Sequence, residues 1–338
     1  MDRRPVLGAT ALALVVLISL PLVAGFFGRL HPALDSFAHF RLHLAILMIA
    51  CAVPLLFGSF RREALMAIAF GLAATTTVTG ASFLPGLRPV HAAFAPRGED
   101  EPVYRLLQIN LRFDNREPEK VLSLIARERP DVVTLNEVSA MWAKKIAPLE
   151  AAYPYRLVCT MDNDAGGVTI LSLRPFAEGK EGRCIDGGTF GTATFDFGGR
   201  PLDIAAMHLH WPWPFDQAEQ VAWIAADLAG LPETVLLAGD LNATPWSAAA
   251  ERIAQAGGFR QVGPIGPTWL FQPMPDFLRF AGLPIDQVFA KGGVRVHSAK
   301  RLEPVGSDHL PVLVEFSLDP LSRAPVEPAQ SITASLQG

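Results

Sequence analysis

The chain has 338 residues, of which 50% are hydrophobic and only 18% are charged. Its formal net charge of -4 excludes a strongly basic protein that binds polyanions through bulk charge. Its three cysteines, Cys51, Cys159 and Cys184, form no C-x-x-C cluster of the kind that holds a metal. The length allows roughly two domains of ~150 residues.

Three apolar runs occupy the first quarter of the chain, at residues 6–27, 42–60 and 64–84. Each approaches the ~20 residues that a helix needs to cross a hydrocarbon core of ~30 Å. A buried helix of a soluble protein is the alternative for each run, and a cleaved signal peptide is a further alternative for the first. Because three runs follow one another with short polar loops between them, we expect a membrane anchor of three transmembrane helices over residues 1–84.

Arginines flank these runs on both sides, with Arg3, Arg4, Arg61 and Arg62 on one side and Arg29, Arg41, Arg88 and Arg97 on the other. The positive-inside count is therefore balanced. The arginines before the first run and the adjacent Arg61 and Arg62 favour a cytoplasmic amino terminus. Three spans would then make this a multi-pass protein of the cell inner membrane with its later residues on the non-cytoplasmic side. Cys159 and Cys184 could form a disulfide in that compartment, or remain two unrelated buried thiols.

Residues 85–102 are rich in proline and end in an acidic run, which is typical of a linker. Residues 103–320 form the extramembrane domain, and residues 321–338 have the composition of a disordered tail. Within the domain, apolar patterning predicts strands at 103–109, 131–135, 155–160, 167–173, 189–197, 202–208, 234–238, 285–290 and 312–318. It predicts helices at 117–129, 141–152, 217–229 and 248–256. This mixture indicates an α/β fold, with two sheets packed as a sandwich and helices flanking them.

Polar side chains gather where the predicted strands end. Glu137 directly follows an apolar strand, and an unpaired carboxylate beside buried surface is costly. A hard cation such as Mg²⁺ or Mn²⁺ would remove that cost, although Glu137 could instead cap the helix near Met141. Asp286 interrupts a strand-like run, and a histidine imidazole is a suitable partner for it. Asp308 and His309 are adjacent in a loop before the last strand.

Other residues of this set have simpler alternatives. Asp240 and Asn242 are good turn formers, and His208 alone is more often a core histidine than a catalyst. His210 and Trp211 belong to the proline-rich HLHWPWP segment, whose aromatic residues could contact a substrate.

In this order, the motifs QIN, NEV, MHLH, GDLNATPWS, IDQVF and GSDHLP resemble those of the endonuclease/exonuclease/phosphatase superfamily. The superfamily includes apurinic endonucleases, pancreatic-type DNases, sphingomyelinases and inositol-polyphosphate phosphatases. The resemblance extends from Tyr104 to Ser317, and the amino-terminal anchor is similar to that of a bacterial membrane-bound branch. It implies a four-layer α/β/β/α sandwich with the site at one end of the two sheets.

The resemblance also implies residue roles. Asn110, Glu137 and Asp308 would lie at the metal, with Glu137 as its main ligand. Asp240 would orient or deprotonate the attacking water, or protonate the leaving oxygen. Asn242 and His208 would hold the phosphate, and His309, oriented by Asp286, would be the general base or would stabilise the transition state. Thr268 and Trp269, in the sequence GPTW, match a weaker feature near the substrate.

Two departures from the family pattern are Asn136, where many members have Gln, and residues 217–234, where no DNA-reading insertion is evident. The expected function is metal-assisted hydrolysis of a phosphodiester or phosphomonoester in nucleic acid, a phospholipid or an envelope phosphoester. Nucleic acid is not favoured, because few basic residues flank the motifs. The lipid bilayer would be the partner of the amino-terminal helices. The alternative is an inactive membrane-tethered binding or scaffold domain with the same fold.

Overall fold

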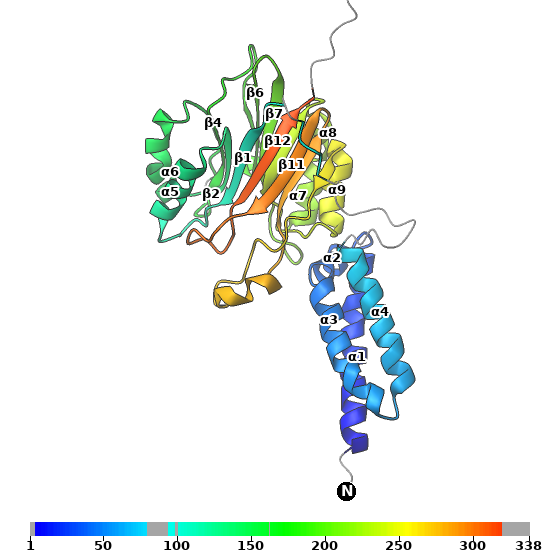
Figure 1. The fold of residues 1–338 in the computed structure, drawn as a ribbon. Helices are drawn as coiled ribbons and strands as arrows, with labels where there is room; N and C mark the ends of the chain where they lie inside the picture. Colours follow the sequence, from blue (N-terminus) through cyan, green and yellow to red (C-terminus); the bar gives the residue numbers. More distant parts are fainter. Residues whose placement is uncertain (1–3, 80–93, 99–100, 162, 320–338) are drawn as a thin grey trace, which may run out of the picture.

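The computed structural model describes residues 4–79, 94–98, 101–161 and 163–319. A helical bundle formed by the first segment stands against a larger domain of two sheets covered by helices (Figure 1). The predicted disordered tail and most of the predicted linker lie outside the described residues. Within the linker, residues 94–98 run beside strand β11 (Val294–Arg301), where the Ala95 N–H donates a 2.7 Å hydrogen bond to the Val296 carbonyl.

The bundle contains three long helical segments that lie side by side (Figure 1). Its elements are α1 (Arg4–Ala24), the 3-10 turn η1 (Gly25–Phe27), α2 (Pro32–Ala38), α3 (Arg41–Ala52), η2 (Val53–Phe57) and α4 (Arg61–Thr79). A helix of 21 residues such as α1 is about 31 Å long, which matches a hydrocarbon core. We call the end formed by η1, α2 and the first turn of α3 the bundle head, and it contacts the sheet domain.

Among the described residues, one helix, Val6–Phe27, is long and apolar enough to cross a membrane. The pair Pro32–Ala38 and Arg41–Phe57 passes the same test together, but it bends by 61°. The expectation of three transmembrane helices is therefore wrong as stated. Helix α4 fails because it begins with Arg61, Arg62 and Glu63 and carries several threonines near its end, and the rest of its predicted span lies outside the described residues.

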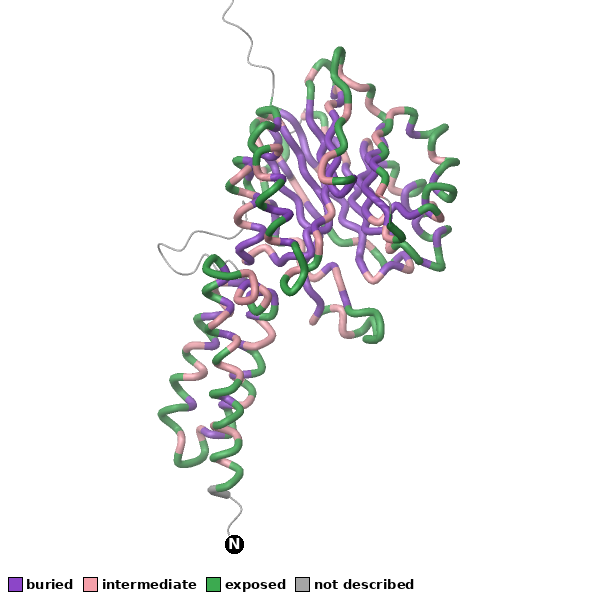
Figure 2. The backbone as a smooth tube through the Cα atoms, turned by 180° about the vertical axis from the view of Figure 1, so that it is seen from behind, coloured by how far each residue is buried: buried purple, intermediate pink, exposed green. Residues whose placement is uncertain are grey.

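Apolar side chains occupy both the interior and the exterior of the bundle. Leu22, Met48 and Ala74 belong to its buried cluster. Many other apolar side chains are exposed, among them Leu14, Leu17, Leu20, Ile46, Leu47, Leu65, Met66 and Leu72. Figure 2 shows how much of the bundle is exposed compared with the sheets. A small water-soluble bundle would place polar residues on that outer surface.

The larger domain has two six-stranded mixed sheets. The first has the order β11-β12-β1-β2-β4-β3, with β12 Val312–Leu318, β1 Tyr104–Asn110, β2 Val132–Val138, β4 Gly167–Ser172 and β3 Tyr155–Val158. The second has the order β5-β6-β7-β8-β10-β9, with β5 Arg183–Ile185, β6 Phe190–Asp196, β7 Pro201–His208, β8 Val235–Asp240, β10 Asp286–Lys291 and β9 Arg260–Val262.

Helices cover the outer face of each sheet, which completes the expected α/β/β/α sandwich (Figure 1). On the first sheet lie α5 (Pro118–Glu128) and α6 (Ala140–Ile146), followed by η3 (Ala147–Ala151). On the second lie α7 (Gln217–Trp223), α8 (Ala225–Ala229) and α9 (Ala248–Gly257). Between the sheets, a core that includes Leu106, Ile170, Phe195 and Phe316 holds the layers together by burying apolar surface.

Strand pairing brings the polar strand ends together. Strands β1 and β2 are parallel, and Asn110 lies opposite Asn136. Strands β7 and β8 are also parallel, and His208 lies opposite Asp240. Asp240 is in turn opposite Asp286 on antiparallel β10. One edge of the sandwich therefore collects polar side chains from both sheets.

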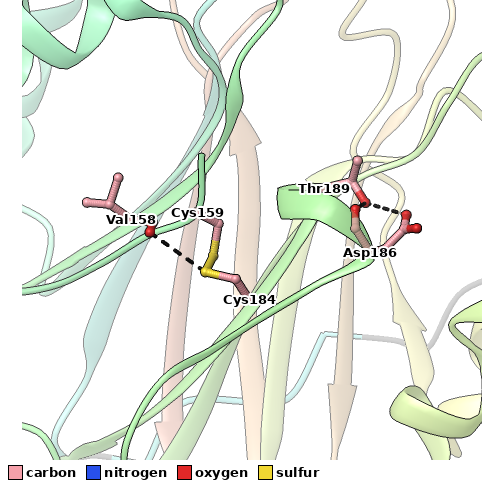
Figure 3. The surroundings of a disulfide bond; sticks show 5 residues. All are labelled: Val158, Cys159, Cys184, Asp186 and Thr189. Carbon is pink, nitrogen blue, oxygen red and sulfur yellow. Dashed lines mark hydrogen bonds between the residues drawn. A yellow bond between two sulfur atoms is a disulfide. The ribbon is translucent and has the colours of Figure 1, made fainter. Parts of the chain in front are cut away.

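Cys159 and Cys184 form a disulfide, which resolves the alternative that the sequence left open (Figure 3). Cys159 follows β3 at the edge of the first sheet, and Cys184 lies in β5 at the edge of the second. The bond therefore joins the two sheets along one side of the sandwich.

Three short or exposed strands were missing from the sequence-based prediction: β5, β9 and β11. In β11 the half-buried Arg295 stands between the buried Val294 and Val296, which is a half-buried strand pattern. The predicted helices at 141–152 and 217–229 are each divided in two, into α6 and η3 and into α7 and α8.

Candidate functional site

Glu137 lies in an unusual backbone conformation at the end of β2. Its φ of 58° is in the left-handed region, which non-glycine residues rarely adopt. The pairing of β2 with β4 shifts register between Leu135 and Val138, so a bulge at Glu137 redirects its side chain. The alternative that Glu137 caps the next helix is wrong, because the Ser139 side chain accepts the capping hydrogen bond from the Trp142 N–H.

Asn110 joins the carboxylates of the two sheets. Its Nδ2 donates to Glu137 Oε1 at 3.0 Å and to Asp240 Oδ2 at 2.9 Å. Its Oδ1 accepts from the Arg112 N–H at 2.9 Å. Glu137 Oε2 accepts from the Phe113 N–H at 2.8 Å. Asn110 therefore orients both carboxylates through its amide group, instead of directing its oxygen toward them.

Asp240 is buried at the end of β8 and has several polar partners. Its Oδ1 accepts from the Asn242 N–H at 2.8 Å, and its Oδ2 lies 3.5 Å from His309 Nε2. Asn242 has a left-handed φ of 46°, and its Nδ2 donates to the Leu209 carbonyl at 2.8 Å. The turn alternative for these two residues is thus also present, because Asn242 closes a turn around the Asp240 carboxylate.

Asp286 has the histidine partner that its position predicts. His309 Nδ1 and Asp286 Oδ2 are 2.8 Å apart, and both side chains are buried. The other ring nitrogen, Nε2, faces Asp240. The imidazole therefore bridges two carboxylates, one from each of two neighbouring strands.

The electrostatics of this group are dominated by burial and by the two acids. Burial lowers the pKa of His309, but Asp286 and Asp240 together outweigh it and raise that pKa to about 10. Burial raises the pKa of Asp240 to about 6, and the nearby Asp286 carboxylate adds to the rise, while His309 opposes it. The imidazolium is therefore the stable form of His309 at neutral pH, and Asp240 can exchange a proton near neutrality.

His208 lies at the cavity rather than within a core. Its Nε2 is 3.7 Å from Asp240 Oδ2 and 4.0 Å from Glu137 Oε1. Glu137, His208 and Asp240 thus present three ligand-type atoms within 4.8 Å of one another. Asp240, Asp286 and His309 form a second such group, but all three are buried and already joined to one another.

Asp308 lines the same cavity, but its hydrogen-bond partners are different from those of Glu137 and Asp240. Its Oδ2 accepts from Trp269 Nε1 at 3.0 Å, and its backbone carbonyl accepts from Arg279 at 3.0 Å. Thr268 Oγ1 accepts from the Asp286 N–H at 3.1 Å, so Thr268 supports the strand start and is itself buried. Asp308 is not among the three ligand-type groups around Glu137.

A cavity of about 430 Å³ connects these residues. Its lining includes Glu137, His208, His210, Trp211, Asp240, Asn242, Trp269, Asp308 and His309. The charged lining residues are Arg112 and the His309 imidazolium on the positive side, and four acids, Glu137, Asp216, Asp240 and Asp308, on the negative side. Arg112 is itself paired with Asp114 at 2.7 Å. An anionic phosphate would therefore be repelled here unless a cation were bound.

His210 and Trp211 form part of the cavity wall. His210 Nδ1 is 2.9 Å from Asp216 Oδ1, and the His210 N–H donates to Gln220 Oε1. The Trp211 ring lies edge-on to Trp269, with centroids 5.8 Å apart. Both residues are placed to contact a molecule in the cavity, as the sequence suggested.

Sequence reasoning did not assign a function to the buried pair that supports this site. Gln108 Nε2 donates to Asn136 Oδ1 at 2.9 Å and to Asp286 Oδ1 at 3.1 Å. Asn136 Oδ1 accepts from the Asp240 N–H at 3.0 Å, and its Nδ2 donates to the Met207 carbonyl. Gln108 and Asn110 are two residues apart on one strand, so their side chains share a face, and this polar repeat in an apolar strand was the available signal.

The donor set fits a divalent cation with a preference for oxygen. Glu137 and Asp240 supply carboxylates held by Asn110, and His208 supplies a nitrogen nearby. Asp308 adds a carboxylate to the cavity wall. Mg²⁺ commonly uses one or two carboxylates and completes its shell with water.

Comparison with known proteins agrees with this architecture. Residues 107–309 match the sequence model of the Endonuclease/Exonuclease/phosphatase family. The endonuclease/exonuclease/phosphatase from Bacteroides vulgatus has a similar structure, with 16% identity and a TM-score of 0.53, over 65% of this chain and 100% of that one. TDP2 from D. rerio, complexed with a single strand DNA product, gives 18% identity and a TM-score of 0.52, over 64% and 100%.

The beta toxin from Staphylococcus aureus, with bound magnesium ions, gives 14% identity and a TM-score of 0.50, over 63% of this chain and 99% of that one. At these identities the likeness concerns the fold. No curated protein matches the sequence.

Proposed function

The chain belongs to the endonuclease/exonuclease/phosphatase family, whose members are hydrolases of phosphoester bonds, and from that premise we propose that it is a membrane-anchored, metal-dependent phosphoesterase. One structural observation gives this proposal its main support. The carboxylates of Glu137 and Asp240 come from different sheets, share the Asn110 amide as a donor, and line one cavity with His208 and His309.

The metal would be held by Glu137 and Asp240, with His208 beside them and Asp308 on the cavity wall. Mg²⁺ or Mn²⁺ at that position would supply charge to offset the negative charge that develops on the phosphoryl oxygens. Asn110 would act by orienting the two carboxylates, since its Nδ2 donates to both. This role differs from direct ligation, which the family resemblance implied for Asn110.

Asp240 and His309 would have different roles. The pKa of Asp240, about 6 without a cation, would fall beside one, so its carboxylate would stay ionised and orient the attacking water. With a pKa of about 10, His309 stays charged, so it is suited to stabilise negative charge on the phosphoryl group and not to act as the general base. Asp286 holds the imidazole in place through Nδ1. Asn242 and His208 would contact the phosphate.

The anchoring part of the proposal is supported by the bundle surface. Helix α1 is uncharged over Val6–Phe27 and only 11% of its most apolar window is buried. Its outward-facing leucines and those of α3 and α4 would contact lipid in a membrane. The buried interior of the bundle and its exposed apolar exterior together favour α1 as the helix that spans the bilayer, with α3 and α4 packed against it.

We further infer that the catalytic domain is on the non-cytoplasmic side. Arg61 and Arg62 are exposed in the first turn of α4, and that helix begins at the end of the bundle opposite the bundle head (Figure 1). Arg29 and Arg41, at the head, are engaged by Glu251 and by the Gly25 carbonyl, respectively. A free positive pair at the far end favours a cytoplasmic position for that end. The Cys159–Cys184 disulfide supports the same orientation, because such bonds persist in oxidising compartments.

The acidic cavity bears on the substrate class. A nuclease usually surrounds its site with basic residues that contact several phosphates. Here Arg279 is paired with Asp276, and Arg112 with Asp114. These pairs favour a substrate with a single phosphoester group over a long polyanion.

The alternative function is a binding or scaffold domain that has lost activity. It predicts that a site residue is missing or displaced. Each expected polar residue is present, and the carboxylates lie within reach of one cation. The enzyme proposal therefore has the stronger support.

The decisive experiment uses the full chain purified in detergent and a soluble activated phosphodiester with Mg²⁺ or Mn²⁺. Turnover should depend on the cation and should fall by about 10²-fold or more in His309→Ala. Glu178→Ala, which alters an exposed acid in the loop after β4, outside the cavity lining, is the matched control. Cation-independent turnover, or equal turnover in His309→Ala and Glu178→Ala, would contradict the proposal. Calorimetric titration without cation affinity would instead favour the scaffold alternative.

A further inference from the structure

Two exposed aromatic segments flank the cavity. The first is Trp211–Phe215, in which Trp211, Trp213 and Phe215 are all exposed. The second, residues 271–281, contains η5 (Asp276–Ala281) and exposes Phe271, Met274, Phe277 and Phe280. Phe277 is 75% and Phe280 76% exposed, which is unusual for phenylalanine in a water-soluble domain. Clustered exposure of this kind marks a surface that contacts something apolar.

Both segments are fixed to the rim of the active site. Trp211 and Phe215 line the catalytic cavity. The second segment leaves the domain between Trp269 and Leu283, which exchange backbone hydrogen bonds of 2.9 Å in each direction. Trp269 also pairs with His309 and donates to Asp308. The exposed phenylalanines are therefore carried on a loop whose base is part of the site.

Both segments also lie at the bundle head. Ser36 Oγ, in α2, donates to the Trp213 carbonyl at 3.1 Å. His43 Nε2, in the first turn of α3, is 2.7 Å from the Ala281 carbonyl. Figure 1 shows the gold-coloured η5 segment projecting from the sandwich to the level of α2 and the start of α3. This is the level at which the apolar surface of the bundle begins.

The bundle head is held firmly enough to fix that level. Asp35 binds the start of α9, and Trp246 Nε1 donates to the Ala38 carbonyl at 2.7 Å. Arg29 pairs with Glu251. The aromatic segments therefore cannot move far from the membrane surface while α1 spans the bilayer. Tryptophan and phenylalanine are well suited to that interfacial layer.

We propose that the bilayer surface is the partner of these two aromatic segments, and that the cavity they flank takes its substrate from that surface, namely a phosphoester carried by a membrane lipid. This rests on the proposed phosphoesterase activity and narrows its substrate class. The reaction is hydrolysis: the water oxygen forms a bond to phosphorus, the bond from phosphorus to the lipid or headgroup oxygen breaks, and that oxygen takes up the proton that water loses.

A lipid substrate is consistent with the charges that line the cavity. A lipid presents one phosphoester at a time, so it needs no extended basic track. The cavity wall is apolar where Trp211, Phe215 and Trp269 lie and acidic where the cation would bind. These two parts of the cavity wall suit a substrate whose single phosphate lies next to apolar groups.

The test compares a double variant, Phe271→Ser with Phe277→Ser, with the control Leu173→Ser, in the full chain. Neither phenylalanine lines the catalytic cavity. Leu173 is an exposed apolar residue just after β4, at the end of that strand opposite Gly167 and the site. Two substrates are used: a soluble activated phosphodiester, and vesicles of phosphatidylethanolamine and phosphatidylglycerol. A water-soluble short-chain lipid with the same headgroups separates surface binding from headgroup recognition.

The wild type and Leu173→Ser should hydrolyse the vesicle lipid. The double variant should lose about tenfold or more in kcat/KM on vesicles while keeping its rate on the soluble ester. Equal losses on both substrates would overturn the proposal, as would turnover of the soluble ester without any turnover of vesicle lipid. Equal rates of wild type on vesicles and on dispersed short-chain lipid would show headgroup recognition without surface contact, and would also overturn it.

A second measurement does not depend on turnover. An environment-sensitive dye is attached to the new cysteine of a Phe277→Cys variant in a Cys51→Ala background. The control is a Glu233→Cys variant in the same background. Glu233 is exposed just before β8, at the end of that strand opposite Asp240. In the same vesicles, brominated lipid should quench the dye at position 277 and not at 233. Equal quenching at both positions contradicts the membrane contact. Absence of turnover on every substrate would reject the proposed function, while the quenching would still decide the contact.

Discussion

Asp35 in α2 of the helical bundle holds the first turn of α9 in the sheet domain, because its carboxylate accepts hydrogen bonds from Ala248 N–H at 2.7 Å and from Ala249 N–H at 3.0 Å. The Ser247 side chain accepts from the Ala250 N–H, and the Ser247 N–H donates to the Thr244 carbonyl. The four free donors at the start of the helix are therefore all paired. The loop that begins with Asp240 and Asn242 ends at this point, so the helical bundle supports the loop that carries these two residues of the candidate site.

Asp35→Ala should lower the unfolding free energy by about 1–3 kcal/mol, because two buried N–H groups lose their acceptor. It should also reduce kcat on a soluble ester, since the loop with Asp240 loses its support. Thermal unfolding in detergent and steady-state kinetics measure both effects. Asp35→Asn, which keeps one acceptor oxygen, should fall between the wild type and Asp35→Ala. A normal melting temperature in Asp35→Ala would show that the contact contributes nothing.

The cation should stabilise the folded protein through Glu137. At a concentration of about 100 times Kd, a ligand that binds only the folded state adds about 2.7 kcal/mol. Mg²⁺ should therefore raise the melting temperature of the wild type, and Glu137→Gln should remove most of that rise while retaining the fold in EDTA. The opposite result, an equal rise in both proteins, would place the cation elsewhere.

The stability of the metal-free protein should fall as the pH rises from about 6.5 to about 10, the span between the ordinary pKa of histidine and that of His309 in the fold. The folded state keeps a proton on His309 that the unfolded chain releases. The resulting contribution to the free energy of unfolding is complete below pH ~6.5 and is lost by pH ~10. Melting in EDTA over this range should show a shallower decline for His309→Gln. Identical slopes for the two proteins would mean that His309 does not hold the extra proton.

Trp269→Phe should keep the ring beside Trp211 and lose only the 3.0 Å hydrogen bond to Asp308. Hydrogen bonds to charged groups contribute about 1.5–3 kcal/mol, so we expect kcat to fall by roughly tenfold with little change in melting temperature. Trp223→Phe, at an exposed tryptophan of α7 that lies outside the cavity lining, is the matched control. A fall in melting temperature that accounts for the whole loss would point to a structural role instead.

The positions of the site residues along the chain were predictable, because strands that end in polar residues can be recognised by their apolar runs. Asn110, Glu137, His208 and Asp240 all lie in the last two residues of their strands. Their mutual arrangement was not predictable from the runs alone. It depends on which strands are neighbours and on register, since one residue of slip would turn each side chain to the other face.

Other features depend on local geometry that leaves little trace in the sequence. The left-handed backbone conformation of Glu137 could not be predicted, because the residue at that position is not a glycine. The buried brace of Gln108 and Asn136 joins residues from both sheets and becomes visible only once the layers are assembled. Asp35 lies between two apolar runs of the sequence, and its partners are more than 200 positions away along the chain.

The helical bundle shows how far hydropathy alone can predict transmembrane spans. Three apolar runs were correctly recognised as helical, but their ends differ. Helix α4 begins with three charged residues, and the second run bends by 61° at its junction with α2. Composition therefore identified an apolar bundle, and the actual helix bounds, with the charged start of α4, distinguish the one candidate span from its neighbours.

The covalent link between Cys159 and Cys184 makes the finished shape of the sandwich sensitive to where the polypeptide matures. Copies retained among reducing thiols would lack the cross-link at the β3–β5 margin, and recombinant material made in such surroundings would differ chemically from copies exported before they fold. The route of production is therefore a variable in its own right for anyone who assays this protein.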